Sequence, residues 1–308
     1  MKRIGGIDEL RGLLAIGIAL FHFFAEGHYY GSWATHNATA DWGSVIVYIF
    51  FIVSGICLYK SNSEVKLPHF YYKRWKSIFP SFYIAWISFY ILRTVTTGNF
   101  NPDSASLWTI PLTVFGVDGY FLYLAPNFYL IGEWFLGAII IIYLLYPLIL
   151  YLFKNYFSWL IILLAVLTLL VSLSDNLFRV YDARNIICCI AGFVIGMVLG
   201  EKDYLLNNKY VLVVSMILSL LLVFFNLSSF LPQILLILLL STSLFIVARY
   251  MLENMSANIV LNRMGGGVLL RYIGGISYQV FLVQHIVIIV FYKFFNPDRL
   301  LISLLFAL

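Results

Sequence analysis

The chain has 308 residues, of which 62% are hydrophobic and only 11% are charged, and its mean hydropathy is +0.95. A soluble domain carries about twice that share of charged residues, so the composition excludes a soluble enzyme and indicates an integral membrane protein. The net charge of +5 is explained by membrane topology, because Lys and Arg gather in cytoplasmic loops. We therefore expect a lipid bilayer around the chain and no nucleic-acid partner.

Apolar runs about 20 residues long, the length that crosses the hydrocarbon core of a bilayer, recur along the whole chain. The sequence predicts one all-α, polytopic bundle over residues 1–308 with nine full membrane-spanning helices. These lie at residues 12–28, 43–60, 78–95, 128–152, 157–174, 184–200, 208–226, 232–250 and 273–292. A tenth run, 300–308, is too short to span, so we expect only a partial tenth helix and possible truncation there. The apolar segment 104–126 is expected to be amphipathic or re-entrant.

The distribution of positive charge predicts the orientation of this bundle. Most of the 19 Lys and Arg residues fall in the loops that share a side with the N-terminus. Because such loops are cytoplasmic, we expect a cytoplasmic N-terminus and a multi-pass protein of the cell membrane, most simply the bacterial cytoplasmic membrane.

The first apolar run, ELRGLLAIGIALFHFF, begins near Arg11 and contains His22. Eleven residues of helix turn about 20° beyond three full turns and rise about 16 Å, so the two side chains share one face at different depths. Alone, His22 could bond a neighbouring helix and Arg11 could reach to the membrane surface. Together they favour a polar cavity, in which a neutral His22 could act as a general base.

Two further ionisable residues lie at a depth similar to that of His22. Glu133 stands one or two turns inside the outer end of the fourth run, and His285 lies about 18 Å into the ninth run. The topology could therefore bring His22, Glu133 and His285 to one level, although His285 could also simply bond a neighbouring helix. No pair of metal ligands occurs at helical spacing, so we expect no metal and no permanently bound cofactor.

A basic segment, HFYYKRWKSIFPSFYIAW, precedes the third run. Lys73, Arg74 and Lys76 are expected just before a helix that starts near Ser77 and Pro80. One interpretation is the ordinary cytoplasmic excess of positive charge. The other is a phosphate clamp, because arginine binds phosphate through two donors and a helix N-terminus adds free N–H groups.

Taken in series, these stretches resemble the acyltransferase-3 family of multi-helix membrane acyltransferases. The matching motifs are Asp8-Glu9-Leu10-Arg11-Gly12 followed by His22, then FFIVSG, KRWKSIFPSFY, EWF with YPL, and ISYQVFLVQH. They occur in the family's order. Two departures are Ser77, where the family often has a second arginine, and Gln284, where it often has a histidine.

The resemblance implies an enzyme that transfers an acyl group, commonly acetyl from acetyl-CoA or another acyl-CoA, to a hydroxyl of a carbohydrate or lipid-linked sugar. It implies that His22 is the catalytic base and that Arg11 and Arg74 position the donor. We add Lys73 and Lys76 as further candidates for donor binding. Glu133 and His285 complete the candidate catalytic set, while Ser54 and Trp134 are candidates for stabilising the oxyanion.

A different class of protein, an exporter or flippase of a glycolipid or small metabolite, would also carry intramembrane Arg, His and Glu. Such transporters usually contain inverted repeats and broken helices, and the sequence shows no repeat. A polysaccharide polymerase would need a large, charged outer loop. The longest outer loop expected here, 95–127, carries only Asp103 and Asp118.

Overall fold

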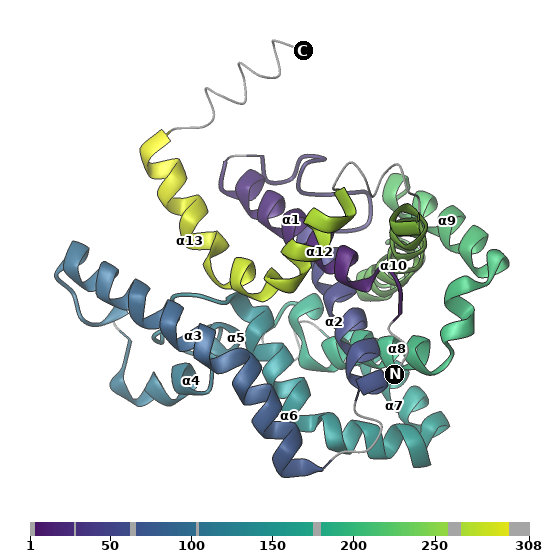
Figure 1. The fold of residues 1–308 in the computed structure, drawn as a ribbon, viewed down its shortest axis with the longest axis horizontal. Helices are drawn as coiled ribbons and strands as arrows, with labels where there is room; N and C mark the ends of the chain where they lie inside the picture. The colour runs from purple at the N-terminus through teal and green to yellow at the C-terminus, as the bar shows by residue number, and fades with distance from the viewer. Residues whose placement is uncertain are drawn as a thin grey trace, which may run out of the picture.

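The computed structural model describes residues 4–27, 29–61, 66–102, 105–174, 180–257 and 266–295. The regular elements within these ranges are helices, which confirms the all-α prediction (Figure 1). The α-helices are α1 (Ile7–Glu26), α2 (Trp42–Ser61), α3 (Leu67–Thr97), α4 (Ile110–Val114), α5 (Asp118–Phe121), α6 (Glu133–Asn155), α7 (Phe157–Leu173), α8 (Ile186–Glu201), α9 (Lys209–Phe224), α10 (Gln233–Ala257), α12 (Gly266–Gly275) and α13 (Ser277–Phe295). Three 3-10 helices are η2 (Leu107–Thr109), η4 (Asp182–Arg184) and η5 (Asp203–Asn207). The predicted partial helix at 300–308 lies outside the described residues.

Five of the described helices, α2, α3, α6, α10 and α13, are long and apolar enough to cross a membrane. The helices α7, α8 and α9 are apolar but shorter, with 17, 16 and 16 residues. Helix α1 has 20 residues but carries the charges of Asp8, Glu9, Arg11 and Glu26. These five helices confirm a multi-pass membrane protein, whereas the count of nine spans and the orientation stay predictions.

The third run forms a longer helix than its apolar part indicated. Helix α3 is continuous over 31 residues and contains Pro80 in its interior. The expected helix start near Ser77 is therefore wrong, and the basic segment lies within the helix rather than before its N-terminus. Polar, exposed side chains do not stop a helix, and Pro68 suits the first turn at Leu67.

Two other predicted segments are interrupted. The ninth run is divided into α12 and α13 by a turn at Ile276, directly after Gly274 and Gly275. Glycine lowers the cost of leaving the helical conformation. The segment 104–126 contains η2, α4 and α5, three short helices between α3 and α6.

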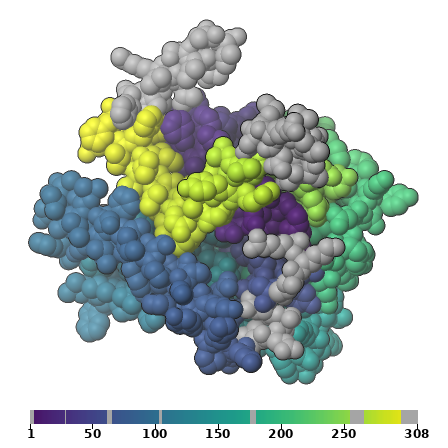
Figure 2. Space-filling model, in the orientation of Figure 1, coloured from purple at the N-terminus to yellow at the C-terminus, as the bar shows by residue number. Residues whose placement is uncertain are grey.

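Helix α1 packs against four other helices, α2, α10, α12 and α13. Figure 2 shows α12 and α13 lying over α1 on one face of the molecule. The closest approach uses two glycines: a Cβ on Gly12 would stand 2.0 Å from the carbonyl oxygen of Leu270, and one on Gly274 would stand 2.0 Å from that of Asp8. Small residues allow backbones to meet in this way, so α12 and α1 are held together beside the site.

A second tight contact joins α2 to α8. A Cβ on Gly55 would lie 2.0 Å from the carbonyl oxygen of Phe193, and one on Gly196 would lie 2.1 Å from that of Ile52. The glycine of the FFIVSG motif therefore serves helix packing. The adjoining Ser54 turns toward a cavity described below.

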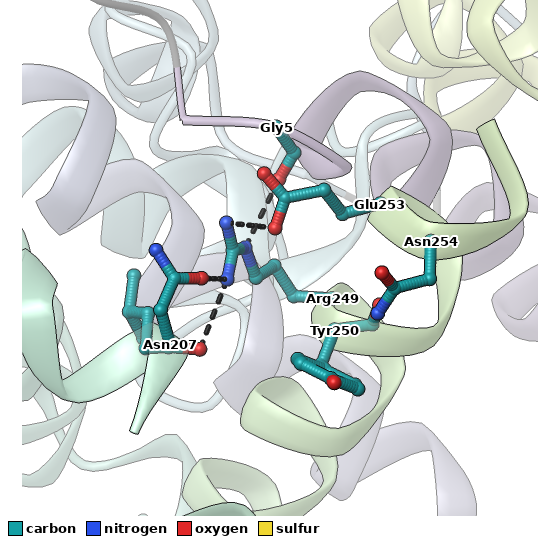
Figure 3. Close-up of polar contacts among 7 residues, drawn as sticks. Gly5, Asn207, Arg249, Tyr250, Glu253 and Asn254 are labelled. Atoms are coloured by element: carbon teal, nitrogen blue, oxygen red, sulfur yellow. Dashed lines mark hydrogen bonds and ion pairs between the residues drawn. The ribbon is translucent and has the colours of Figure 1, made fainter. Parts of the chain in front are cut away.

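The N-terminal end of α1 is held by a buried cation, Arg249 of α10, whose polar contacts are drawn in Figure 3. The residue is 2% exposed. Its guanidinium donates to the carbonyl oxygens of Gly5 at 3.1 Å and Leu206 at 3.0 Å, and to Oδ1 of Asn207 at 2.8 Å. It also forms an ion pair with Glu253. A buried charge needs such partners, and these contacts tie the start of α1 to η5 and α10.

Candidate active site

His22 of α1, Glu133 of α6 and His285 of α13 converge in the structure. Their ring nitrogens and carboxylate oxygen lie within 4.8 Å of one another. Glu133 Oε1 is 2.9 Å from His285 Nδ1. The rings of His22 and His285 meet edge to face, with centroids 5.2 Å apart. Three helices that are distant in the chain therefore place two imidazoles and one carboxylate together.

The backbone at Glu133 is strained. Gly132 has φ +88° and Glu133 has φ +46°, so the N-cap and the first residue of α6 both have a positive φ. This conformation is unfavourable for a residue with a side chain and often marks a functional site. Helix α6 starts at Glu133 rather than at 128, so the carboxylate stands at its N-terminus, where the helix dipole favours a negative charge, and not one or two turns inside.

A cavity of about 630 Å³, which we name the His22 cavity, opens beside this cluster. Its polar wall includes His22, Glu133, Trp134, Asp41, Arg184, Tyr30, His36, Tyr181 and Gln233. Among the described residues, His22 and Glu133 line the cavity and His285 does not. His22 is therefore the imidazole of the cluster that a molecule in the cavity meets, with His285 beside it and paired to Glu133.

A second cavity, the Arg11 cavity, has a volume of about 310 Å³. Arg11 donates from Nη2 to Ser277 Oγ at 3.1 Å. Arg74 lies 5.7 Å from the ring centre of Tyr143 and 5.9 Å from that of Phe70. Its buried Nε atom has no hydrogen-bond partner among the described residues. The described lining holds both guanidinium groups and no carboxylate, an arrangement that attracts an anion.

The remaining predicted residues divide between the cavities or lie outside them. Ser54 lines the Arg11 cavity and Trp134 lines the His22 cavity. Lys73 and Lys76 are exposed on α3 and do not belong to the described lining of either cavity. The structure thus brings Arg11 together with Arg74 but not with the two lysines.

Two aromatic residues separate the cavities. Phe135 of α6 and Phe281 of α13 line both of them. Their rings meet edge to face with centroids 5.3 Å apart. Because both rings line both cavities, we name this pair the Phe135–Phe281 partition.

Sequence reasoning missed three charged residues near the site. Glu9 is 5% exposed and pairs with Arg271 of α12 at 2.6 Å, beside the crossing of α1 and α12. Arg184, at the end of η4, places its guanidinium 5.7 Å from the ring centre of Trp134. The only available signal for Arg184 was a cation directly before the apolar run of α8.

The cluster has a donor set that could hold a metal ion. Two imidazoles and one carboxylate are ligands that zinc accepts, and the three groups are close enough to share an ion. The sequence expectation of no metal rested on ligand pairs within one helix, and this set comes from three. That expectation stays a prediction.

Comparison with known proteins identifies the family. The acyltransferase-3 family model, described as an acyltransferase domain, matches residues 4–308. No match is found among curated proteins or among solved structures. The match covers essentially the whole chain and does not favour an exporter. The chain belongs to the acyltransferase-3 family and is a membrane acyltransferase.

Proposed function

We propose that the protein transfers an acyl group, most simply acetyl, from acyl-CoA to a hydroxyl of a cell-surface or lipid-linked carbohydrate. The observation that carries this proposal is the convergence of His22, Glu133 and His285 beside one cavity, whose wall includes His22 and Glu133. A second cavity with two arginines lies directly across the Phe135–Phe281 partition. The arrangement supplies a base on one side and an anion-binding chamber on the other.

The Arg11 cavity suits the phosphates of an acyl-CoA donor. Arginine binds phosphate oxygens through paired donors, and Arg74 has a buried Nε without a partner among the described residues. Arg11 uses one N–H of its guanidinium in the hydrogen bond to Ser277, and its other N–H donors remain available to a ligand. In the predicted topology this cavity faces the cytoplasm, where acyl-CoA is made. Lys73 and Lys76 then act at most through long-range attraction.

The acyl end of the donor would reach past the Phe135–Phe281 partition toward His22. The rise of α1 between Arg11 and His22 is about 16 Å, a distance that the extended pantetheine arm of coenzyme A covers. The walls of the Arg11 cavity include Phe50, Val53 and Ile139. These apolar side chains suit a neutral arm.

His22 would remove the proton from the acceptor hydroxyl as its oxygen attacks the thioester carbon. The resulting tetrahedral oxyanion collapses, the carbon–sulfur bond breaks, and the thiolate takes the proton from His22. The imidazolium that forms in between is stabilised by the nearby carboxylate of Glu133, whose Oε1 lies 2.9 Å from His285 Nδ1. The Trp134 indole faces the same cavity and is better placed than Ser54 to donate to the oxyanion.

The test is release of free thiol from acetyl-CoA by the purified full-length protein in detergent. We expect slow thiol release by the wild type, which disappears in His22→Ala and persists in His69→Ala. His69 is an exposed histidine of α3 and serves as the matched control, and both variants are checked for an unchanged Tm. Equal release by wild type and His22→Ala would remove His22 as the base. Absence of thiol release together with absence of coenzyme A binding would overturn the proposal.

A further inference from the structure

The His22 cavity contains one cation whose role the transfer reaction does not explain. Among the residues described, its lining has two carboxylates, Asp41 and Glu133, and one guanidinium, Arg184. The two carboxylates are occupied. Asp41 accepts from the Ser44 backbone N–H and hydroxyl, both at 2.7 Å, and Glu133 contacts His285. The side chain of Arg184, by contrast, has neither an ion pair nor a hydrogen bond with any of the described residues, and its guanidinium contacts the ring of Trp134.

The neutral groups around Arg184 are engaged with one another. Burial raises the pKa of Tyr181 to about 12, so its phenol is neutral and donates to Oε1 of Gln233 at 3.2 Å. Gln233 in turn donates to the carbonyl oxygen of Thr39 at 3.3 Å. These contacts leave Arg184 as the charge in this wall that is free to bind a ligand.

The position of Arg184 is set by an aromatic ring rather than by an anion. Its guanidinium lies over Trp134, a contact that holds the plane of an arginine while its N–H donors remain available. Trp134 follows Glu133 directly in the chain. An anion bound by Arg184 would therefore sit beside the group that assists His22.

We infer that the acceptor in the His22 cavity is an acidic saccharide, whose carboxylate or phosphate is bound by Arg184. This inference rests on the proposed function, since it names the chemistry of the acceptor at the same site. The guanidinium offers the paired donors that match either anion. Trp134, Tyr30 and Tyr181 add the aromatic faces against which a sugar ring packs.

Specificity would arise because an acidic sugar gains affinity from Arg184, and not because neutral sugars are repelled. Arg184 is exposed in the free protein, so binding of a neutral sugar would not cost the guanidinium an existing ion pair. An acidic sugar forms a charge-assisted, two-point contact and brings a negative charge to a wall that already holds Asp41 and Glu133. Without Arg184, that negative charge would be repelled.

The experiment compares two probes that differ only in the carboxylate, methyl β-D-glucuronide and methyl β-D-glucoside, with glucose 6-phosphate as the phosphate arm. Binding to the purified full-length protein is measured by calorimetry without a donor. We expect at least one acidic probe to bind about tenfold more tightly than the glucoside. The arm that binds identifies the carboxylate or the phosphate as the recognised anion.

Variants assign any such preference to Arg184. In Arg184→Gln we expect the two methyl glycosides and glucose 6-phosphate to bind with similar affinity. Arg184→Lys should keep part of the preference for the acidic probes, because lysine retains the positive charge but not the paired N–H donors of the guanidinium. Arg93→Gln is the matched control, since Arg93 is a partly exposed arginine that donates to the carbonyl oxygen of Asn99 and is not part of the described lining of the cavity. Equal binding of acidic and neutral probes by the wild type, or a preference that survives in Arg184→Gln, would overturn the inference.

Addition of acetyl-CoA separates this inference from the proposed function. If an acidic probe binds through Arg184 and also accelerates thiol release, both stand. If it binds through Arg184 but no thiol is ever released, the anion site stands and the transfer reaction fails. If thiol release is accelerated equally by the glucoside, the transfer reaction stands and the acidic acceptor fails.

Discussion

Arg74 and Lys73 are neighbours in the chain with different surroundings, and this difference can be measured. Arg74 lines the Arg11 cavity, whereas Lys73 is exposed outside it. We predict that Arg74→Gln weakens coenzyme A binding about tenfold or more, because a paired phosphate contact is lost. Lys73→Gln should change it by about twofold or less, as expected for a screened surface charge. Calorimetric titration with coenzyme A checks both, and equal losses would place the donor on the surface of α3 instead.

Asp118 gives a prediction for the dependence of stability on pH. It is 1% exposed and lies on α5, between the predicted spans α3 and α6, and burial raises its pKa from 3.8 to about 6. A raised carboxyl pKa means that the folded state holds the proton more tightly than the unfolded state. The contribution of Asp118 to stability is therefore greatest below about pH 4, and about 3 kcal/mol of it is lost as the pH rises through 6.

The matched variant is Asp118→Asn, because its amide can replace both contacts of the carboxyl. Its oxygen can accept from the Gly119 N–H, and its NH₂ can donate to the Thr113 hydroxyl, in place of the present bonds at 3.0 and 2.9 Å. We expect the fall in Tm between pH 4 and pH 6.5 to be smaller in the variant than in the wild type. An identical pH profile for both proteins would show that Asp118 does not titrate in this range.

The residues of the candidate site differ in how well they could be predicted. Arg11 and His22 share one helix, so their spacing alone placed them on one face at two depths. Glu133 and His285 could be matched in depth only by assuming the topology, and the structure brings them into contact. Arg184 could not be predicted, because its position depends on η4 meeting Trp134, a contact between distant segments that leaves no periodic pattern.

Among the elements, the start of α6 offers the clearest test of how the backbone sets the site. We predict that Gly132→Ala destabilises the protein by about 1–2 kcal/mol through its φ of +88° and also disturbs transfer. The added Cβ would lie 2.7 Å from Leu136 Cδ2, so the turn that aims Glu133 must shift. Thermal unfolding and acetyl-CoA thiol release measure the two effects.

Gly98→Ala is the control for this substitution. Gly98 also has a positive φ, +68°, but a Cβ there would meet nothing within 4 Å, and the residue caps the far end of α3. Its variant should lose a similar amount of stability while thiol release remains. Loss of thiol release in both variants would attribute the effect to general destabilisation rather than to the position of Glu133.

The helices that hydropathy placed least well are those whose limits depend on polar residues or on packing. The start of α3 is polar and exposed, so it lies outside the apolar run although its residues are helical. The break between α12 and α13 follows from Gly274, whose closeness to α1 no local pattern reveals. The termini of α2, α7 and α9 lie within two residues of the predicted limits, because Asn and charged residues bound those apolar runs clearly.

Across the whole molecule, the two cavities are consistent with the predicted topology. The polar lining of the His22 cavity comes largely from segments expected outside, including Tyr30, Asp41, Arg184 and Gln233. The Arg11 cavity is lined by Ser61, Arg74 and Ser77, which are expected at the cytoplasmic side. This separation depends on short helices such as α9 crossing the bilayer, since each failed crossing would reverse the side of every later segment.

Helix α9 is the most informative place to test that dependence. Its 16 residues extend about 24 Å, less than the roughly 30 Å of the hydrocarbon core, so its flanking residues must complete the crossing. We predict that, with the natural cysteines replaced, a membrane-impermeant maleimide labels Asn226→Cys in intact cells but labels Lys209→Cys only after the cells are opened. Both positions are exposed in the structure, so access is set by the membrane. Labelling of both in intact cells, or of neither, would mean that α9 does not span; the reverse pattern would place the N-terminus outside and exchange the sides assigned to donor and acceptor.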